Sequence, residues 1–213
     1  MSAFNGRRLP VYLVLDVSGS MTGEPIEAVR QGVKALLSDL RADPQALETA
    51  YLAVITFGNE AVQHSPLTEL TAFMEPAISA CGTTAFGAAL TLLRKSIEDE
   101  VKRSSETVKG DWRPLIFLMT DGCPTDLWQG PAAKLREAKV GNLVACAAGP
   151  NADVAVLQQI TESVVQLNTL QPDQLKAFFK WVSASIKATS QAISGGVGPL
   201  NLPAMPAGLT IVP

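Results

Sequence analysis

Hydroxyl and carboxylate side chains gather in three short motifs of this 213-residue chain. The motifs are Asp16–Ser20 (DVSGS), Gly82–Leu90 (GTTAFGAAL) and Met119–Gly122 (MTDG). Together they offer two carboxylates and several hydroxyls, which are the hard oxygen ligands that Mg²⁺, Mn²⁺ and Ca²⁺ prefer. Because Ser18 and Ser20 are two residues apart in a turn, both hydroxyls can face one ion. The three motifs therefore predict a divalent cation site.

The rest of the composition argues against most other site chemistries. His64 is the only histidine, so multi-histidine metal sites are excluded and at most one imidazole can serve a Ser–His or Cys–His mechanism. Cys81, Cys123 and Cys146 are widely spaced, an odd count that argues against a disulfide framework or a zinc cage. The net charge of −3 gives no support to nucleic-acid or anionic-membrane binding.

The elements that must position these motifs alternate between buried strands and amphipathic helices. Continuous apolar runs at Val11–Leu15 and Leu115–Met119 end directly at the first and third motifs, as strands of a parallel sheet do. The sequence predicts an α/β fold with a doubly wound, mostly parallel sheet, one antiparallel edge strand and helices on both faces. The expected strands are residues 11–15, 51–57, 61–70 (the antiparallel edge), 115–119, 143–147 and 164–167. The expected helices are residues 24–40, 71–80 (a short helix or a turn), 85–103, 131–139, 154–160 and 172–189.

Composition divides the chain into a folded domain, residues 1–190, and a tail, residues 191–213. The tail contains four glycines, four prolines and no charged residue. It includes the PxxP segment Pro203–Pro206, for which packing of the tail along its own domain, or a mobile tail, is favoured over binding to an aromatic groove. The nine charged residues of Glu98–Arg113 predict a solvated helix end and loop. No apolar stretch precedes Pro10, so we expect a soluble, cytoplasmic protein without a signal peptide.

In this order, the three motifs resemble the metal-ion-dependent adhesion site of the von Willebrand factor A family. That family carries DxSxS after its first strand, a threonine in a loop before a helix, and an aspartate after a central strand. The resemblance implies that the hydroxyls contact the ion directly or through water, and that the aspartates anchor the ion or its waters. The implied metal-site residues are Asp16, Ser18, Ser20, Thr84 and Asp121, with Mg²⁺ expected and Mn²⁺ or Ca²⁺ as alternatives.

The threonine assignment leaves one alternative open. Family sequences often read Gly-Gly-Thr followed six residues later by Leu or Ile. Counting back six residues from Leu90 gives Thr84, and Thr83 then stands where the second glycine often lies. Thr84 is the predicted ligand, and Thr83 is retained as the alternative.

A narrower resemblance links the chain to the bacterial tellurite-resistance-associated TerY type. It rests on Leu9–Gly23 (LPVYLVLDVSGSMTG), Thr56–Phe57 and Asp121–Trp128 (DGCPTDLW). That type is a compact cytoplasmic von Willebrand A protein. The resemblance implies a role in a stress-response system beside a kinase-like and a phosphatase partner.

These observations favour a protein-binding module over an enzyme. A Glu or Asp of a partner protein would complete the coordination of the ion, next to a rim formed by Met21, Thr22, Thr83 and Gly122. For Met21 and Thr22 the alternative is simple loop packing. A metal-dependent phosphoester hydrolase is less favoured, because Ser18 stands where aspartyl-phosphate enzymes carry a second carboxylate. A scaffold protein with an inert metal site is the other alternative.

Four further residues have ordinary interpretations that are favoured. Cys81 and Cys123 lie near the second and third motifs, and two free thiols are favoured over a redox pair. His64 is expected to be a surface or structural residue. Asp126 is expected to cap the next helix rather than to support the metal site.

Overall fold

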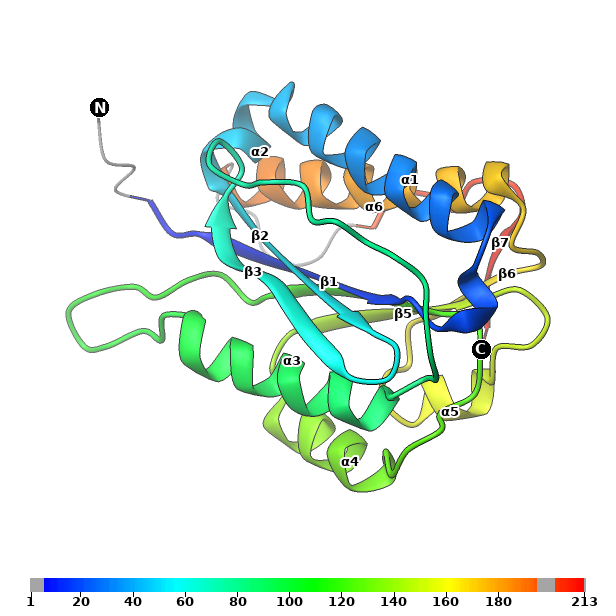
Figure 1. Ribbon diagram of the computed structural model, residues 1–213. Helices are drawn as coiled ribbons and strands as arrows, with labels where there is room; N and C mark the ends of the chain where they lie inside the picture. Colours follow the sequence, from blue (N-terminus) through cyan, green and yellow to red (C-terminus); the bar gives the residue numbers. More distant parts are fainter. Residues whose placement is uncertain (1–5, 195–201, 213) are drawn as a thin grey trace.

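A computed structural model describes residues 6–194 and 202–212, which form a seven-stranded sheet covered by helices on both faces (Figure 1). The strand order is β3-β2-β1-β4-β5-β6-β7. The five inner strands are parallel, and β3 and β7 join the two edges antiparallel to their neighbours. The strands are β1 (Leu9–Asp16), β2 (Ala50–Phe57), β3 (Ala61–Glu69), β4 (Leu115–Thr120), β5 (Asn142–Ala148), β6 (Val164–Leu167) and β7 (Leu209–Val212).

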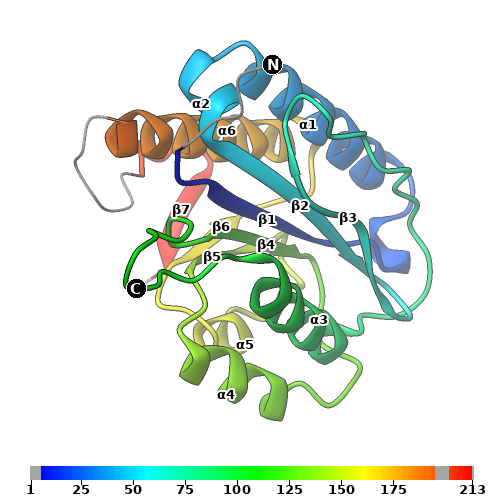
Figure 2. The same cartoon turned by 90° about the vertical axis from the view of Figure 1, so that its left-hand side faces the viewer.

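The helices form one layer on each side of the sheet, as Figures 1 and 2 show from two directions. Helices α1, α2 and α6 cover one face, and α3, α4 and α5 cover the other. A single turn of 3₁₀ helix, η1 (Gly19–Met21), follows β1. The helices are α1 (Glu24–Arg41), α2 (Pro44–Thr49), α3 (Phe86–Glu100), α4 (Gln129–Ala138), α5 (Val154–Gln158) and α6 (Pro172–Ser194).

The continuous apolar character of β1 follows from this two-sided burial. Leu13 and Leu15 pack into the core between the sheet and α1 and α6, whereas Tyr12 and Val14 pack into the core beneath α3. Alternate side chains of a strand point to opposite faces, so a strand covered on both faces needs apolar residues throughout. Every residue of β1 is buried, including its last, Asp16.

The predicted α/β fold with a mostly parallel sheet is confirmed, and β3 is the expected antiparallel edge strand. Two helices, α2 and α6, differ from the sequence prediction. Helix α2 was not predicted, although Pro44 begins it and Asp43 caps it by accepting a hydrogen bond from Ala46 N at 2.9 Å. Residues 71–80 begin with a turn, which was one of the two forms expected there, and continue as irregular chain. Helix α6 continues to Ser194, beyond the expected end at residue 189.

The described part of the tail packs on the domain, which is one of the two alternatives favoured for the PxxP segment. Trp181 Nε1 on α6 donates a hydrogen bond to the carbonyl of Pro203 at 3.1 Å, and Met205 packs against the core. Residues Leu209–Val212 then form β7 beside β6, which gives the sheet a second antiparallel edge. Residues 195–201 lie outside the described residues, and the division of the chain at residue 190 stays a prediction.

Candidate metal centre

The first motif is fixed by hydrogen bonds on both oxygens of Asp16. Its Oδ1 accepts the backbone N–H of Ser18 at 2.8 Å, and its Oδ2 accepts the hydroxyl of Thr120 at 2.5 Å. The side chain is 0% exposed. Because β1 and β4 are neighbouring parallel strands, their carboxyl ends bring Asp16 and Thr120 together. The Asp16 carboxylate is therefore held in one orientation at the end of the sheet.

A chain of hydroxyls connects the first motif to the third. Ser18 Oγ and Ser20 Oγ are 3.0 Å apart, and Ser20 Oγ donates a hydrogen bond to Asp121 Oδ1 at 2.9 Å. The turn η1 makes this spacing, because it curls the backbone directly after Ser18. The structure thus brings the side chains of Ser18, Ser20 and Asp121 into one hydrogen-bonded group beside Asp16.

The two threonines of the second motif point to different neighbours. Thr84 is 6% exposed and forms two hydrogen bonds of 3.0 Å with Thr125, one from its own N–H and one to its carbonyl. A Cβ added to Gly122 would lie 3.5 Å from Thr84 Oγ1, so this hydroxyl borders the third motif. Thr83 is exposed, and its N–H and hydroxyl both contact Asn59 Oδ1, at 3.0 and 3.3 Å. The structure therefore brings Thr84 to the site and holds Thr83 against Asn59.

Backbone hydrogen bonds join the loops that carry the first and second motifs. Gly19 N–H donates to the carbonyl of Gly82 at 2.9 Å, and Cys81 N–H donates to that of Val17 at 2.8 Å. Gly82 has a φ of 81°, and a Cβ there would lie 2.3 Å from the side chain of Asn59. Only glycine adopts this conformation at low cost, so Gly82 allows the two loops to approach closely.

Asp126 corrects one sequence prediction. Its carboxylate caps α3, which precedes it in the chain, by accepting the N–H groups of Gly87 and Ala88 at 2.9 Å each. The next helix, α4, begins after Trp128 without a side-chain cap. The reason is that the loop after β4 folds back over the first turn of α3, where a Cβ on Gly87 would lie 2.4 Å from the carbonyl of Leu127. The cap therefore fastens the third motif's loop to the helix that follows the second motif.

Burial and mutual repulsion disfavour the charged forms of the two aspartates. Burial raises the pKa of Asp16, and the hydrogen bonds from Ser18 and Thr120 offset only part of this rise. Burial also raises the pKa of Asp121, the hydrogen bond from Ser20 offsets part of that rise, and the negative charge of Asp16 adds to it. A cation placed between the two carboxylates would remove both penalties.

The donor set fits a hard divalent cation. Among the residues that the structure describes, no group of three or more His, Cys, Asp and Glu side chains is placed so that it could hold a metal ion, which leaves oxygen ligands from hydroxyls and two carboxylates. Mg²⁺ and Mn²⁺ take such ligands and retain several waters. Cys81 and Cys123 are exposed free thiols, and Cys146 is buried in β5.

One residue at the site differs from its expected role, and one functional residue was missed. Met21 is fully buried, so its side chain packs in the core beneath η1 instead of lining a rim; Thr22, beside it, is exposed. The sequence interpretation assigned no role to Thr120, whose hydroxyl orients Asp16. Its position at the end of a predicted buried strand, directly before Asp121, was the available signal.

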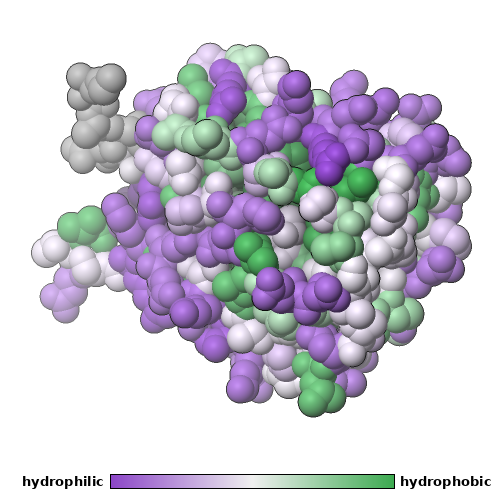
Figure 3. Space-filling model, viewed as in Figure 1, coloured by the Kyte–Doolittle hydropathy of each residue, from purple (hydrophilic) through white to green (hydrophobic). Residues whose placement is uncertain are grey.

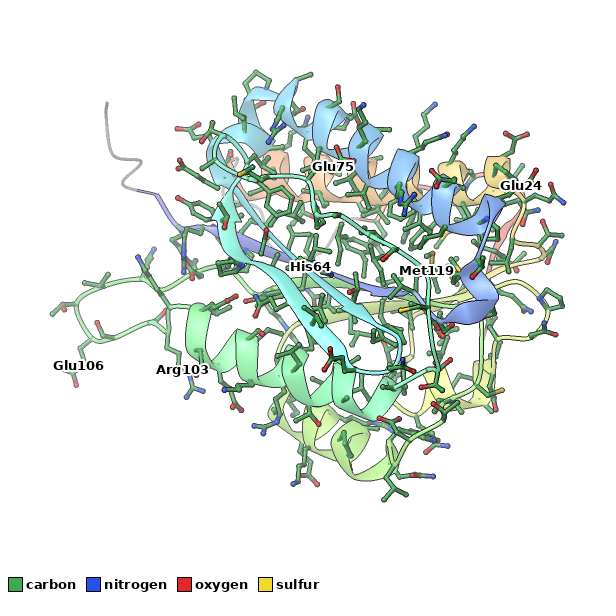
Figure 4. The ribbon with its side chains drawn as sticks, in the orientation of Figure 1. Glu24, His64, Glu75, Arg103, Glu106 and Met119 are labelled. Carbon is green, nitrogen blue, oxygen red and sulfur yellow. The ribbon has the colours of Figure 1, made fainter. Side chains whose placement is uncertain are left out.

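His64 has a structural partner away from the three motifs. Its Nε2 lies 2.7 Å from Thr56 Oγ1, so the imidazole links edge strand β3 to β2 (Figure 4). This contact agrees with the structural role expected for the residue.

Comparison with known proteins gives a family and a set of similar folds. The model of the von Willebrand factor type A domain matches residues 11–179. Proximal thread matrix protein 1 from the mussel byssus matches with a TM-score of 0.63 and 19% identity over 84% of this chain and 48% of that chain. A second structure of that protein, described with a zinc-occupied MIDAS motif, has a TM-score of 0.60 at the same identity. No curated protein sequence matched.

Two bacterial structures extend the comparison. A von Willebrand factor type A protein from Catenulispora acidiphila has a TM-score of 0.64 and 18% identity over 85% of this chain and 43% of that one. The conserved hypothetical protein BatB from Bacteroides thetaiotaomicron has a TM-score of 0.54 and 18% identity over 84% and 98%. The chain thus spans about half the length of the first matched structures, and these likenesses concern the fold.

Proposed function

The chain belongs to the von Willebrand factor type A domain family, and on this premise we propose that it is a metal-dependent protein-binding module. Domains of this family typically act as interaction modules. The observation that carries the proposal is the hydrogen-bonded group that joins Asp16, Ser18, Ser20 and Asp121 at the carboxyl end of the sheet. It gathers oxygen ligands from two separate strands with no imidazole or thiolate among them.

Each residue of the group has a distinct role in this proposal. The hydroxyls of Ser18, Ser20 and Thr84 contact the ion directly or through water. The carboxylates of Asp16 and Asp121 balance its charge, and Thr120 and Ser18 N–H keep Asp16 in place. The ion, when bound, supplies positive charge and a coordination position for an anionic oxygen. Mg²⁺ is the proposed ion, with Mn²⁺ and Ca²⁺ as alternatives.

The partner in this proposal is a protein that presents a Glu or Asp side chain to the site. Two carboxylates on this chain balance a divalent ion, so a third carboxylate is attracted only when the ion is present, which makes binding metal-dependent. Thr22 and Thr83 are exposed and Gly122 is half-buried, and these three residues form the proposed contact rim. The resemblance to the tellurite-resistance-associated TerY type extends the proposal to a cytoplasmic stress-response system with a kinase-like or phosphatase partner.

Two observations argue against hydrolysis at this site. Ser18 takes the position at which an aspartyl-phosphate enzyme would need a second carboxylate. His64, the one histidine, bonds to Thr56 on β2 and gives no base to either serine.

None of the helices in the described residues is long and apolar enough to cross a membrane.

Calorimetric titration with Mg²⁺ and Mn²⁺ tests the metal site. Asp16→Ala and Ser18→Ala should abolish measurable binding while the circular dichroism spectrum of the folded chain persists. Asp43→Ala is the matched control, because it removes a carboxylate that caps α2, which directly precedes β2 at the end of the sheet opposite to the three motifs. Undiminished binding by Asp16→Ala would refute the assignment. Pull-downs with and without EDTA then test the interaction. A partner that stays bound in EDTA would indicate a scaffold with an inert metal site.

A further inference from the structure

A cleft lies at the end of the sheet opposite to the metal centre. It has a volume of about 540 Å³ between the start of β1, Tyr51 at the start of β2 and the loop that follows α3. Figure 4 shows that loop by its labelled residues Arg103 and Glu106, while Met119, two residues before Asp121, lies toward the opposite end of the sheet. Figure 2 views the molecule from the loop's side.

The walls of this basic cleft carry four cations and one carboxylate. The cations are Arg7, Arg8, Lys102 and Lys109, and the carboxylate is Asp111. The whole chain has a net charge of −3, so the excess of positive charge in this cleft is opposite in sign to the net charge of the chain. In the hydropathy view, hydrophilic residues cover most of the surface at this end (Figure 3).

Internal hydrogen bonds already satisfy the one carboxylate of the cleft. Arg8 donates to Asp111 Oδ1 at 2.8 Å and to Oδ2 at 2.5 Å, and Oδ2 also accepts Lys102 N–H at 2.8 Å. Arg7 lies 3.7 Å from the centre of the Trp112 ring and donates to the carbonyls of Gly110 and Asp111. The two arginines are therefore held in place by these contacts. The negative charge of Asp111 beside them is already neutralised by Arg8.

The two lysines have no such partners. Lys102 and Lys109 are exposed, and across residues 6–194 and 202–212 no carboxylate or carbonyl pairs with either ammonium group. The groups that remain unused in the cleft are thus hydrogen-bond donors with positive charge. An anionic ligand is the complement of such a surface.

The distribution of these donors favours an extended acidic ligand over a single phosphate. The free ammonium groups come from two positions seven residues apart on the loop, and the guanidinium groups line a different wall. The N–H groups of Lys102 and Gly110 are already used, by Asp111 Oδ2 and Ser104 Oγ, so neither is available to a phosphate. Val108 is 65% exposed at the edge of the cleft and adds an apolar contact.

From these observations we propose that the basic cleft binds an acidic segment of a partner protein, with several carboxylates spread along it. The cleft shares no residue with the metal centre and lies at the opposite end of the sheet. The chain then carries two independent acidic-ligand sites, one metal-dependent and one metal-independent. It would act as an adaptor that holds two partners at once.

Fluorescence anisotropy in metal-depleted buffer tests this proposal on the full chain. The probe is a labelled ten-residue peptide with Glu at alternate positions, and the matched peptide carries Gln at the same positions. The wild type should bind the Glu peptide and not the Gln peptide, and 300 mM NaCl should weaken binding relative to 50 mM. The double variant Lys102→Gln/Lys109→Gln should lose at least about fivefold in affinity.

A second double variant controls for the loss of charge itself. Lys34→Gln/Lys134→Gln removes two exposed lysines from α1 and α4, outside the cleft, and should change the affinity by less than about twofold. Equal binding by both double variants would overturn the proposal, as would absence of binding to the wild type. Binding of a labelled single-stranded oligonucleotide by the wild type without binding of the Glu peptide would also overturn the proposal and identify a phosphate site instead. Mg²⁺ titration of the same variants separates this outcome from failure of the metal site.

Discussion

The carboxylate of Asp16 is subject to two opposing influences. Hydrogen bonds from Ser18 N–H and Thr120 stabilise its charged form, whereas complete burial destabilises it, and burial has the larger effect on its pKa. A residue selected only for stability would not carry this penalty. A bound cation would balance the charge of Asp16 and so offset this penalty. In the metal-free protein the buried charge lowers the stability of the folded state.

Asp16→Asn should stabilise the metal-free protein at neutral pH. The amide can keep both contacts, with its oxygen accepting Ser18 N–H and its nitrogen donating to Thr120. In the wild type the pKa of Asp16 is raised from 3.8, so between 3.8 and that higher value the folded state holds more protons than the unfolded state. Stability due to this group is therefore lost as pH rises through that window. We expect a gain of about 1 kcal/mol, or roughly 2–4 °C in Tm, at pH 7.

Thermal unfolding in EDTA from pH 4 to pH 7 measures this difference. The Tm advantage of Asp16→Asn over the wild type should be small near pH 4 and should increase with pH. Saturating Mg²⁺ should reverse the order at pH 7, because only the wild type gains stability from a bound ion. An advantage that is constant across the pH range would show that ionisation of Asp16 is not its cause.

Thr84 and Thr83 are adjacent, yet their replacement should have different effects on metal affinity. Thr84→Val removes a buried hydroxyl that borders Gly122 and keeps the backbone hydrogen bonds to Thr125, so Mg²⁺ affinity should fall about tenfold or more. Thr83→Val removes only the contact to Asn59 and should leave affinity within about twofold. Calorimetry on both variants distinguishes them. The reverse result would transfer the ligand role to Thr83.

At the scale of elements, the cap on α3 couples a helix to the metal centre. Asp126→Ala removes both hydrogen bonds to the first turn of α3 and loosens the loop in which Thr125 holds Thr84. We expect a loss of about 1–2 kcal/mol in unfolding free energy and a several-fold loss in Mg²⁺ affinity. Asp43→Ala is the control, because it uncaps α2 away from the site and should lower stability alone. Denaturant unfolding and calorimetry measure the two effects, and unchanged metal affinity in Asp126→Ala would contradict the coupling.

The sequence predicted elements well where the evidence was local. The apolar runs of β1 and β4 and the amphipathic pattern of α1 required no knowledge of distant residues. The cap by Asp126 was assigned to the wrong helix because capping patterns are read forward along the chain, whereas the loop after β4 folds back onto α3. The role of Thr120 depends on β4 lying beside β1. The sequence of neither strand indicates which strand will be its neighbour in the sheet.

At the scale of the whole molecule, the order of the strands decides which ends of the chain can interact. The loops after β1 and β4 meet because these two strands are neighbours at the centre of the sheet. The basic cleft lies at the opposite end of the sheet, where β1 and β2 begin. Strand β7 completes the far edge of the same sheet, and this was the part of the fold that the sequence did not indicate. Its four residues carry no pattern distinct from the uncharged tail around them, and pairing with β6 creates the strand.

The same sheet gives a prediction that separates stability from metal binding. Shortening the chain after Ser194 removes β7 and the hydrogen bond between Trp181 and Pro203, and it exposes the edge of β6. Leu209 is 4% exposed, so loss of its burial alone should cost about 1.5–3 kcal/mol, which lowers Tm by several degrees.

Mg²⁺ affinity of the shortened chain should stay within about twofold of the full chain, because β4 and β5 separate β1 from this edge. Thermal unfolding and calorimetry on the same two proteins check both statements. Leu209→Ala provides a graded version if the shortened chain fails to fold. A parallel loss of stability and metal affinity in Leu209→Ala would mean that the tail supports the metal centre and that the division at residue 190 does not separate independent parts.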